Sequence, residues 1–152
     1  ADKQSVLHEK GYHNLFGGNR ASKVKIRNVK IQNSKGDGVR ILDSRDVTVS
    51  GNKIYGVGHD GFYCERCVDV EASRNEIYTR INSGLRSKGS KNVIFRDNII
   101  KSTKKYKPRT GPGIQVENSR ANETTSNVRI LNILLMDARV QGSGQLVILH
   151  LL

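Results

Sequence analysis

The sequence predicts an all-β fold: a right-handed, single-stranded parallel β-helix of about five coils, each of about 23 residues. Three kinds of residue recur at a step of 23, and this step predicts the fold. They are the valines Val24, Val47, Val70 and Val93, the asparagines Asn52, Asn75 and Asn98, and the glycines Gly38, Gly61 and Gly84. A constant step over consecutive copies is typical of a solenoid, in which each copy forms one coil and stacks on the next.

Each repeat contains three short segments in which apolar residues alternate with other residues. One segment begins at the repeated valine, the second follows the asparagine, and the third follows the glycine. The segments are too short and too rich in β-branched residues to be helices, so we expect three strands per coil. A leucine-rich repeat has a similar period but needs a leucine consensus that this chain lacks. An antiparallel sandwich would not produce a constant step.

Stacked coils place equivalent residues about 4.8 Å apart, in columns that run along the solenoid. The inward columns consist of valines and isoleucines, and the repeated asparagines can form a hydrogen-bonded amide ladder. The first copy has Val29 at the asparagine position. Later in the chain, insertions lengthen the glycine step to the 29 residues between Gly84 and Gly113.

A length of 152 residues fits one domain. We expect residues 1–22 to cap the first coil, 23–134 to form the coils, and 135–152 to form the last coil or the C-terminal edge. The chain is also compatible with a piece of a longer protein. Its longest apolar tract is too short to span a bilayer, so we expect no membrane insertion. No signal peptide begins at Ala1, so we expect any export signal to have been removed or never to have been present.

The chain carries 26 lysines and arginines against 14 acidic residues, which gives a formal net charge of +12. This surplus predicts a polyanionic partner, although dispersed lysines also serve solubility. Aromatic residues are not interleaved with the basic ones, and no nucleic-acid-binding motif is present. Nucleic acid is therefore a less favoured partner than an acidic polysaccharide.

Cys64 and Cys67 form a single C-x-x-C. A structural zinc site needs a second pair or histidines at set spacing, and a thioredoxin-like site needs a helix after the first strand. Cys64 also occupies the repeat position of Ile41 and Val116. We therefore expect both thiols to be structural.

Alignment of the glycine strands predicts columns of outward side chains. Val39, Phe62, Leu85 and Ile114 are expected to point inward. Outward we expect one column of Arg40, Tyr63, Arg86 and Gln115, a second of Leu42, Glu65, Lys88 and Glu117, and a third of Asp37, Asp60 and Ser83 beside His59 and Asn82.

These outward residues form the candidate site. Stacked Asp37 and Asp60 suit the separation of about 5–5.5 Å between the carboxyl groups of retaining glycosidases. His59 or Tyr63 is a candidate for proton transfer, while Arg86 and Lys88 are candidates to hold a uronate carboxylate. The alternative is a solvated strand face with aspartates that serve the turns.

We expect no metal site and no cofactor, although Asp37, Asp60 and Glu65 leave a weak calcium site open. The insertion from Lys101 to Pro112 precedes the fourth glycine strand, where it would form a cleft wall or a surface loop.

Three stretches resemble the β-helix domain associated with archaeal disaggregatases: Gly58–Gly61, Arg80–Arg86 and Gly111–Gln115. Disaggregatases are cell-surface proteins of methanogens that break up an acidic, chondroitin-like matrix. The resemblance covers roughly residues 24–134, and it implies a site at His59, Asp60, Arg80, Asn82 and Arg86. Lys88 and the lysine-rich insertion depart from it by making this copy unusually basic.

A wider resemblance is to pectin-degrading β-helices. Gly84-Leu85-Arg86-Ser87-Lys88 is similar to the G-x-R-x-K of polygalacturonases. The doubled aspartate and the separate His-Gly coil of that family are not reproduced in order, so its mechanism is not transferred.

The expected function is that of a carbohydrate-active β-helix, a hydrolase or a lyase, that cleaves an acidic, uronic-acid-containing polysaccharide outside the cell or at its surface. The catalytic candidates are His59, Asp60, Asp37 and Tyr63. The substrate-binding candidates are Arg40, Arg80, Asn82, Arg86, Lys88 and Gln115. The alternative is a non-catalytic module that binds glycans or builds a surface protein.

Overall fold

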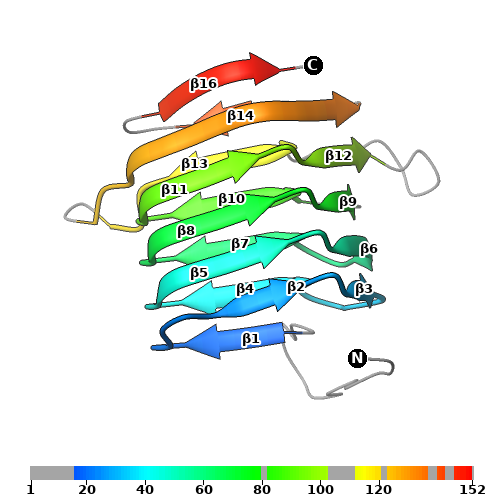
Figure 1. The fold of residues 1–152 in the computed structure, drawn as a ribbon, viewed down its shortest axis with the longest axis horizontal. Coiled ribbons are helices and arrows are strands. Elements are labelled where there is room, and N and C mark those ends of the chain that lie inside the picture. Colours follow the sequence, from blue (N-terminus) through cyan, green and yellow to red (C-terminus); the bar gives the residue numbers. More distant parts are fainter. Residues whose placement is uncertain are drawn as a thin grey trace.

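The computed structural model describes residues 16–79, 82–102, 112–120, 123–136, 140–142 and 146–151. All regular secondary structure in these segments is β-strand, and the strands stack in parallel from β1 at one end to β16 at the other (Figure 1). None of the described segments forms a helix that is long and apolar enough to cross a membrane. This architecture confirms the predicted parallel β-helix.

Each coil contributes one strand to each of three sheets, which we name after the residue repeated in each. The glycine sheet contains β1 (Phe16–Asn19), β4 (Val39–Leu42), β7 (Phe62–Glu65), β10 (Leu85–Lys88), β13 (Ile114–Glu117) and β15 (Val140–Gly142). The valine sheet contains β2 (Lys25–Arg27), β5 (Arg45–Ser50), β8 (Val68–Ser73), β11 (Lys91–Arg96), β14 (Ser126–Met136) and β16 (Leu146–Leu151). The isoleucine sheet contains β3 (Lys30–Gln32), β6 (Lys53–Val57), β9 (Glu76–Thr79), β12 (Ile99–Ser102) and the end of β14.

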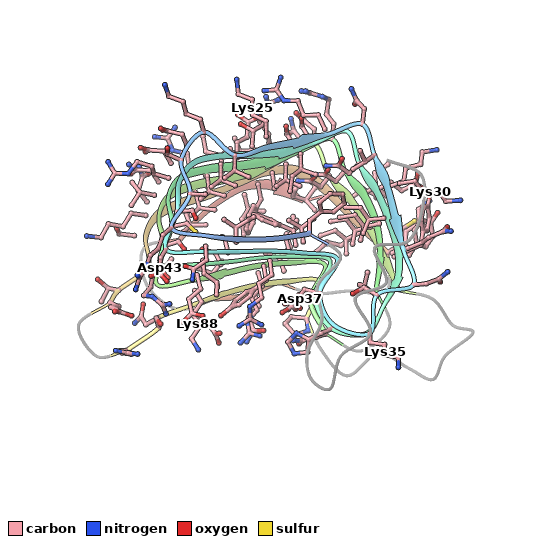
Figure 2. All side chains as sticks on the ribbon, turned by 90° about the horizontal axis from the view of Figure 1, so that it is seen from below. Lys25, Lys30, Lys35, Asp37, Asp43 and Lys88 are labelled. Atoms are coloured by element: carbon pink, nitrogen blue, oxygen red, sulfur yellow. The ribbon has the colours of Figure 1, made fainter. Side chains whose placement is uncertain are left out.

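The register between neighbouring coils follows the step of 23. Val47 pairs with Val70, which pairs with Val93, and Ile54 pairs with Ile77. These side chains are buried and fill the interior that Figure 2 shows in end view. The core is therefore a set of apolar columns.

Two features of the coils were not predicted. The strand β1 lies within the segment 1–22 that we expected to act as a cap, and the rest of that segment, 1–15, lies outside the described residues. Phe16 pairs with Val39 and Gly18 pairs with Ile41, so the step of 23 extends one copy earlier than the valines show. In addition, β14 runs through both the valine and the isoleucine sheet as one strand of 11 residues.

The predicted amide ladder is present. Asn52 Nδ2 donates to Asn75 Oδ1 at 3.0 Å, and Asn75 Nδ2 donates to Asn98 Oδ1 at 2.9 Å. Each of these oxygens also accepts the backbone N–H of the asparagine one coil earlier, and Val29 joins the ladder through its N–H to Asn52. Buried amides whose donors and acceptors are all used fix the register of the stack.

The repeated glycines allow the turn into the glycine sheet to approach its neighbours closely. A Cβ atom at Gly61 would lie 2.5 Å from the carbonyl oxygen of Gly84 and 2.6 Å from Cγ2 of Ile77. No larger residue fits there without a shift of the backbone.

Both cysteines are free thiols buried in the core, as expected. Burial raises the pKa of Cys64 to about 12 and also raises that of Cys67. The N–H of Cys67 donates to Ser90 Oγ at 3.0 Å. The pair is therefore part of the packed interior.

Candidate functional site

The candidate site lies where each coil turns from the isoleucine sheet into the glycine sheet. Asp37 and Asp60 occupy this turn in successive coils, and both side chains are fully buried. Asp37 Oδ1 accepts the N–H of Asp60 at 2.9 Å, and Asp60 Oδ1 accepts the N–H of Ser83 at 2.8 Å. The predicted third column therefore exists as a ladder that supports the turns.

His59 lies against both aspartates. Its Nδ1 is 2.9 Å from Asp37 Oδ1 and 3.0 Å from Asp60 Oδ2. Hydrogen bonds to Asp37 and Asp60 raise the pKa of His59 to about 9, against the opposing effect of burial. Because its side chain keeps 25% exposure, this imidazolium is in contact with solvent.

The second ring nitrogen of His59 faces Asn82, with Nε2 3.0 Å from the side-chain amide nitrogen. In the neutral ring, Nδ1 donates to the carboxylates and Nε2 accepts from this amide. In the imidazolium, Nε2 donates, so the Asn82 amide must turn its oxygen toward the ring. Asn82 therefore holds the exposed side of the ring in either protonation state.

The predicted column of Arg40, Tyr63 and Arg86 is present on the glycine sheet. The guanidinium of Arg40 lies 4.8 Å from the centroid of the Tyr63 ring, and that of Arg86 lies 5.0 Å from it. The ring is sandwiched between two cations and is only 4% exposed. Burial, followed by the hydrogen bond to Glu65, raises the pKa of Tyr63, so its hydroxyl stays protonated.

The two arginines also neutralise the buried aspartates. Arg40 Nη1 is 3.4 Å from Asp37 Oδ2, and Arg86 Nη1 is 3.3 Å from Asp60 Oδ2. Arg86 Nε additionally donates to Glu117 at 3.0 Å. Two buried carboxylates thus share three cationic neighbours, which offsets the cost of their burial.

The far end of the glycine strands carries a second polar network. Tyr63 donates to Glu65 Oε2 at 2.7 Å, and Gln115 Nε2 donates to Glu117 Oε2 at 3.1 Å. Although burial favours its neutral form, the pKa of Glu65 is lowered, because Tyr63 and Ser119 donate to it and Arg66 and Lys88 lie nearby. Both glutamates are therefore tied to neighbours within the sheet.

The structure gathers most of the predicted site residues on one face. Asp37, His59, Asp60 and Asn82 form one cluster, and Arg40, Tyr63, Arg86 and Gln115 form the adjacent column. Lys88 lies two residues further along its strand, in register with Glu65 and Glu117. Arg80 and residues 103–111 of the insertion lie outside the described residues.

The contact of His59 with both aspartates was not predicted from the sequence, which suggested an aspartate pair with the histidine beside it. A signal exists in the spacing. His59 follows Asp37 by 22 residues, one less than the repeat, so it occupies the turn position next to the column of Asp37 and Asp60.

A family model for the right-handed β-helix region matches residues 8–144. The chain belongs to this family. No curated protein and no solved structure matched it. The right-handed β-helix fold is consistent with proteins that act on or bind polysaccharides.

Within this right-handed β-helix, one described cluster has the donor set of a metal site. Ligand atoms of Asp37, His59 and Asp60 all lie within 4.8 Å of one another. Their oxygens, however, already accept hydrogen bonds from backbone amides, His59 and the arginines. Glu65, the third acidic residue considered for calcium, lies at the opposite end of β7 from this cluster. A charged imidazole in place of a cation accounts for the cluster as it stands.

Proposed function

We propose that this β-helix acts on an acidic, uronic-acid-containing polysaccharide and cleaves it with His59 as the proton donor. The observation that carries the proposal is the imidazole of His59, which two buried carboxylates hold at 2.9 and 3.0 Å on a partly exposed face. A group with a pKa of about 9 is mostly protonated at neutral pH. It is therefore suited to protonate a leaving group.

The neighbouring column supplies recognition. Arg40 and Arg86 flank Tyr63 beside His59, and Lys88 follows along β10. Guanidinium groups bind carboxylates through paired hydrogen bonds, which suits a uronate at Arg40, whose side chain is 30% exposed. Arg86 adds positive charge beside it, because its own donors already bind Asp60 and Glu117. Asn82 and Gln115 add amide groups that can bind sugar hydroxyls.

In the proposed reaction, this chain carries out one proton transfer, through His59. In the free protein, Nε2 of His59 is hydrogen-bonded to the Asn82 amide, which the glycosidic oxygen of the substrate must displace. Nε2 then gives its proton to this oxygen as the bond from the oxygen to the sugar ring breaks, so one sugar leaves as an alcohol. In hydrolysis the other fragment takes up the hydroxide of a water molecule, whose remaining proton passes to the solvent. In elimination the other fragment loses a ring proton to the solvent. Asp37 and Asp60 act as positioning residues, because their buried carboxylates set the orientation and pKa of His59.

The proposal extends to the setting of the reaction. Cleavage of a chondroitin-like matrix, as in the disaggregation of cells that share it, would place the protein outside the cell or on its surface. The formal net charge of +12 supports a polyanionic substrate.

The experiment incubates the full chain with chondroitin and with polygalacturonate, and follows both new reducing ends and the ultraviolet absorbance of unsaturated products. His59→Gln should lose at least about 100-fold in rate, because general acid catalysis contributes that much or more. Lys91→Gln, at an exposed site on the valine sheet, is the control and should keep full activity. Equal rates for His59→Gln and the parent would overturn the proposal.

A second candidate is a non-catalytic module that binds the same kind of glycan. The observation that favours it is the hydrogen bonding of Asp37 and Asp60 to backbone N–H groups, as expected of turn residues. This module would bind acidic glycans with strong salt dependence and release no products. Binding that survives His59→Gln, with no cleavage by the parent protein, would select it.

A further inference from the structure

The outer surface of the first coil carries a run of one charge. Residues 20–35 contain six basic residues and no acidic one. The six are Arg20, Lys23, Lys25, Arg27, Lys30 and Lys35, and all of them are exposed. In later coils of the described chain several basic residues pair with carboxylates, as Arg66 does with Asp43 and Arg96 does with Glu71.

Three of these cations project from regular strands. Lys25 and Arg27 alternate outward on β2, and Lys30 lies on β3. Figure 2 shows Lys25 and Lys30 pointing away from the coil on two different sides. Alternate residues of a strand lie about 6.6 Å apart, so the positive charges follow the strands at short intervals.

The second coil does not neutralise these charges. Lys25 pairs in register with Thr48, and Arg27 pairs with Ser50. Lys30 pairs with Lys53, another exposed lysine, whose neighbour in the third coil is Glu76. Like charges directly opposite each other in a sheet are unfavourable, so this arrangement reduces stability. We call Lys25, Arg27, Lys30 and Lys53 the basic strip.

Protection of the exposed edge strands offers another explanation for lysines at this end. That role is served by single charged residues on an edge strand, especially lysine, and it does not require six basic residues without an acidic one. An unbroken positive run attracts polyanions in particular.

We propose that the basic strip is a second binding surface for the acidic polysaccharide, separate from the His59 face. The identity of the polymer rests on the proposed function. Residues 20–35 contain no aromatic side chain, and Tyr55, two residues after Lys53 on β6, already stacks on Tyr78. The surface therefore offers few rings to a base and favours an acidic glycan over a single-stranded nucleic acid.

The strip leads toward the site. Lys35 lies in the turn that connects β3 to Asp37, and both residues are labelled on the same side of the end view in Figure 2. A chain that is bound along the strip can therefore continue to Arg40 and His59. Binding at two places on one polymer raises its effective concentration at the site. The strip should accordingly matter for long chains and not for short oligosaccharides.

The test reverses three charges of the strip in the variant Lys25→Glu, Arg27→Glu, Lys30→Glu. The control reverses three exposed charges of later coils, in Arg74→Glu, Lys91→Glu, Arg129→Glu, so both variants have the same net charge. Binding to long-chain polygalacturonate at low salt should weaken at least about tenfold in the first variant and less than about threefold in the second. Circular dichroism checks the fold, and the corresponding glutamine variants replace any glutamate variant that does not fold.

Equal weakening in both variants would show a general charge effect and overturn the proposal, as would unchanged binding in the strip variant. Tighter binding of the parent protein to a single-stranded DNA oligomer than to polygalacturonate would overturn the choice of polymer. The strip variant should still cleave a short oligogalacturonide at the parent rate, whereas His59→Gln should bind the long polymer and not cleave it. The experiment therefore distinguishes an error in the proposal for the strip from an error in the proposed function.

Discussion

Nδ1 of His59 lies 2.9 Å from Oδ1 of Asp37, the turn residue one coil earlier. The same oxygen accepts the N–H of Asp60, so one carboxylate supports both the turn and the imidazole. Because the structural and chemical roles meet in the same atoms, a substitution here changes stability and the properties of His59 together. Experiments must therefore measure the change in stability and the change in the pKa of His59 separately.

Asp60→Asn should lower the pKa of His59 from about 9 toward its ordinary value of 6.5. The substitution removes one of the two carboxylates at Nδ1 and leaves a buried amide against Arg86. Stability should also fall, by about 1–3 kcal/mol at neutral pH. Proton NMR titration of the imidazole, assigned by its absence in His59→Gln, measures the pKa. Glu71→Gln on the valine sheet is the control and should leave it unchanged.

The activity of Asp60→Asn distinguishes a residue that positions His59 from one that serves only the turn. A positioning role predicts reduced activity with a pH profile displaced toward acid, because His59 loses its proton at lower pH. If the variant unfolds early but keeps the parent's activity and pH profile, Asp60 serves only the turn.

Asn75→Ala should destabilise the fold by about 2–4 kcal/mol. Asn75 is buried, its Oδ1 accepts from both the N–H and the Nδ2 of Asn52, and its Nδ2 donates to Val49 and Asn98. Alanine leaves several of these buried groups without partners. Urea unfolding followed by circular dichroism gives the free energy of unfolding.

The control for the ladder is Asn92→Gly. Asn92 also forms side-chain hydrogen bonds between coils, to Asp69 and Asn127, but it is exposed. Its φ of 54° is one that glycine adopts freely. The loss should stay within about 0.5 kcal/mol, and a loss equal to that of Asn75→Ala would contradict the importance of burial.

The fold could be predicted because each coil fills the same core positions with the same kinds of residue. Val47, Val70 and Val93 occupy equivalent core positions, so valine recurs in the sequence at the step of 23. The first glycine-sheet strand, β1, was missed because Phe16 and Gly18 fill inward positions that valine and isoleucine fill later. The joined strand β14 has no counterpart among the earlier copies.

The candidate site could be predicted only as columns. Strand alternation places Arg40, Tyr63 and Arg86 in one row, and the structure stacks them as expected. Side-chain directions within turns do not follow from a repeat, so the sequence could not predict the contact of His59 with both aspartates. The same limit applies to burial: Asp37 and Asp60 were expected on an outward face, and both are fully buried.

Gly61→Ala should destabilise the fold by about 1–3 kcal/mol, as overpacking of a core does. The new methyl group would meet a backbone carbonyl and the Ile77 side chain at 2.5 and 2.6 Å. Gly18→Ala is the comparison, since its methyl group would meet only the end of the Ile41 side chain, at 3.0 Å. Thermal unfolding of the two variants should show the larger loss for Gly61→Ala, and a larger loss at Gly18 would contradict this packing.

Cys64 and Cys67 should not react with a thiol reagent in the folded protein at neutral pH. Both side chains are buried, and burial raises the pKa of Cys64 to about 12. The thiolate is the reactive form, so neither residue supplies a nucleophile while the protein is folded. Titration with a chromogenic disulfide should release colour only after addition of urea. Rapid release of two equivalents without urea would place the thiols at the surface.

The contribution of His59 to stability should disappear as the pH rises through about 9. Its pKa in the folded protein, about 9, lies above the ordinary value of 6.5, so folding favours the imidazolium. The stabilisation is complete below about pH 6.5, where the ring is protonated in both states, and it decreases between about pH 6.5 and 9. The measurement is the free energy of unfolding of the parent minus that of His59→Gln, from urea titrations at about pH 6, 8 and 10. The subtraction removes the other groups that titrate in this range. The difference should be largest at pH 6 and smallest at pH 10, and a difference that stays constant would show that folding does not raise the pKa of His59 above its ordinary value. The ring would then be mostly neutral above about pH 6.5 and would lack the proton that the proposed reaction uses.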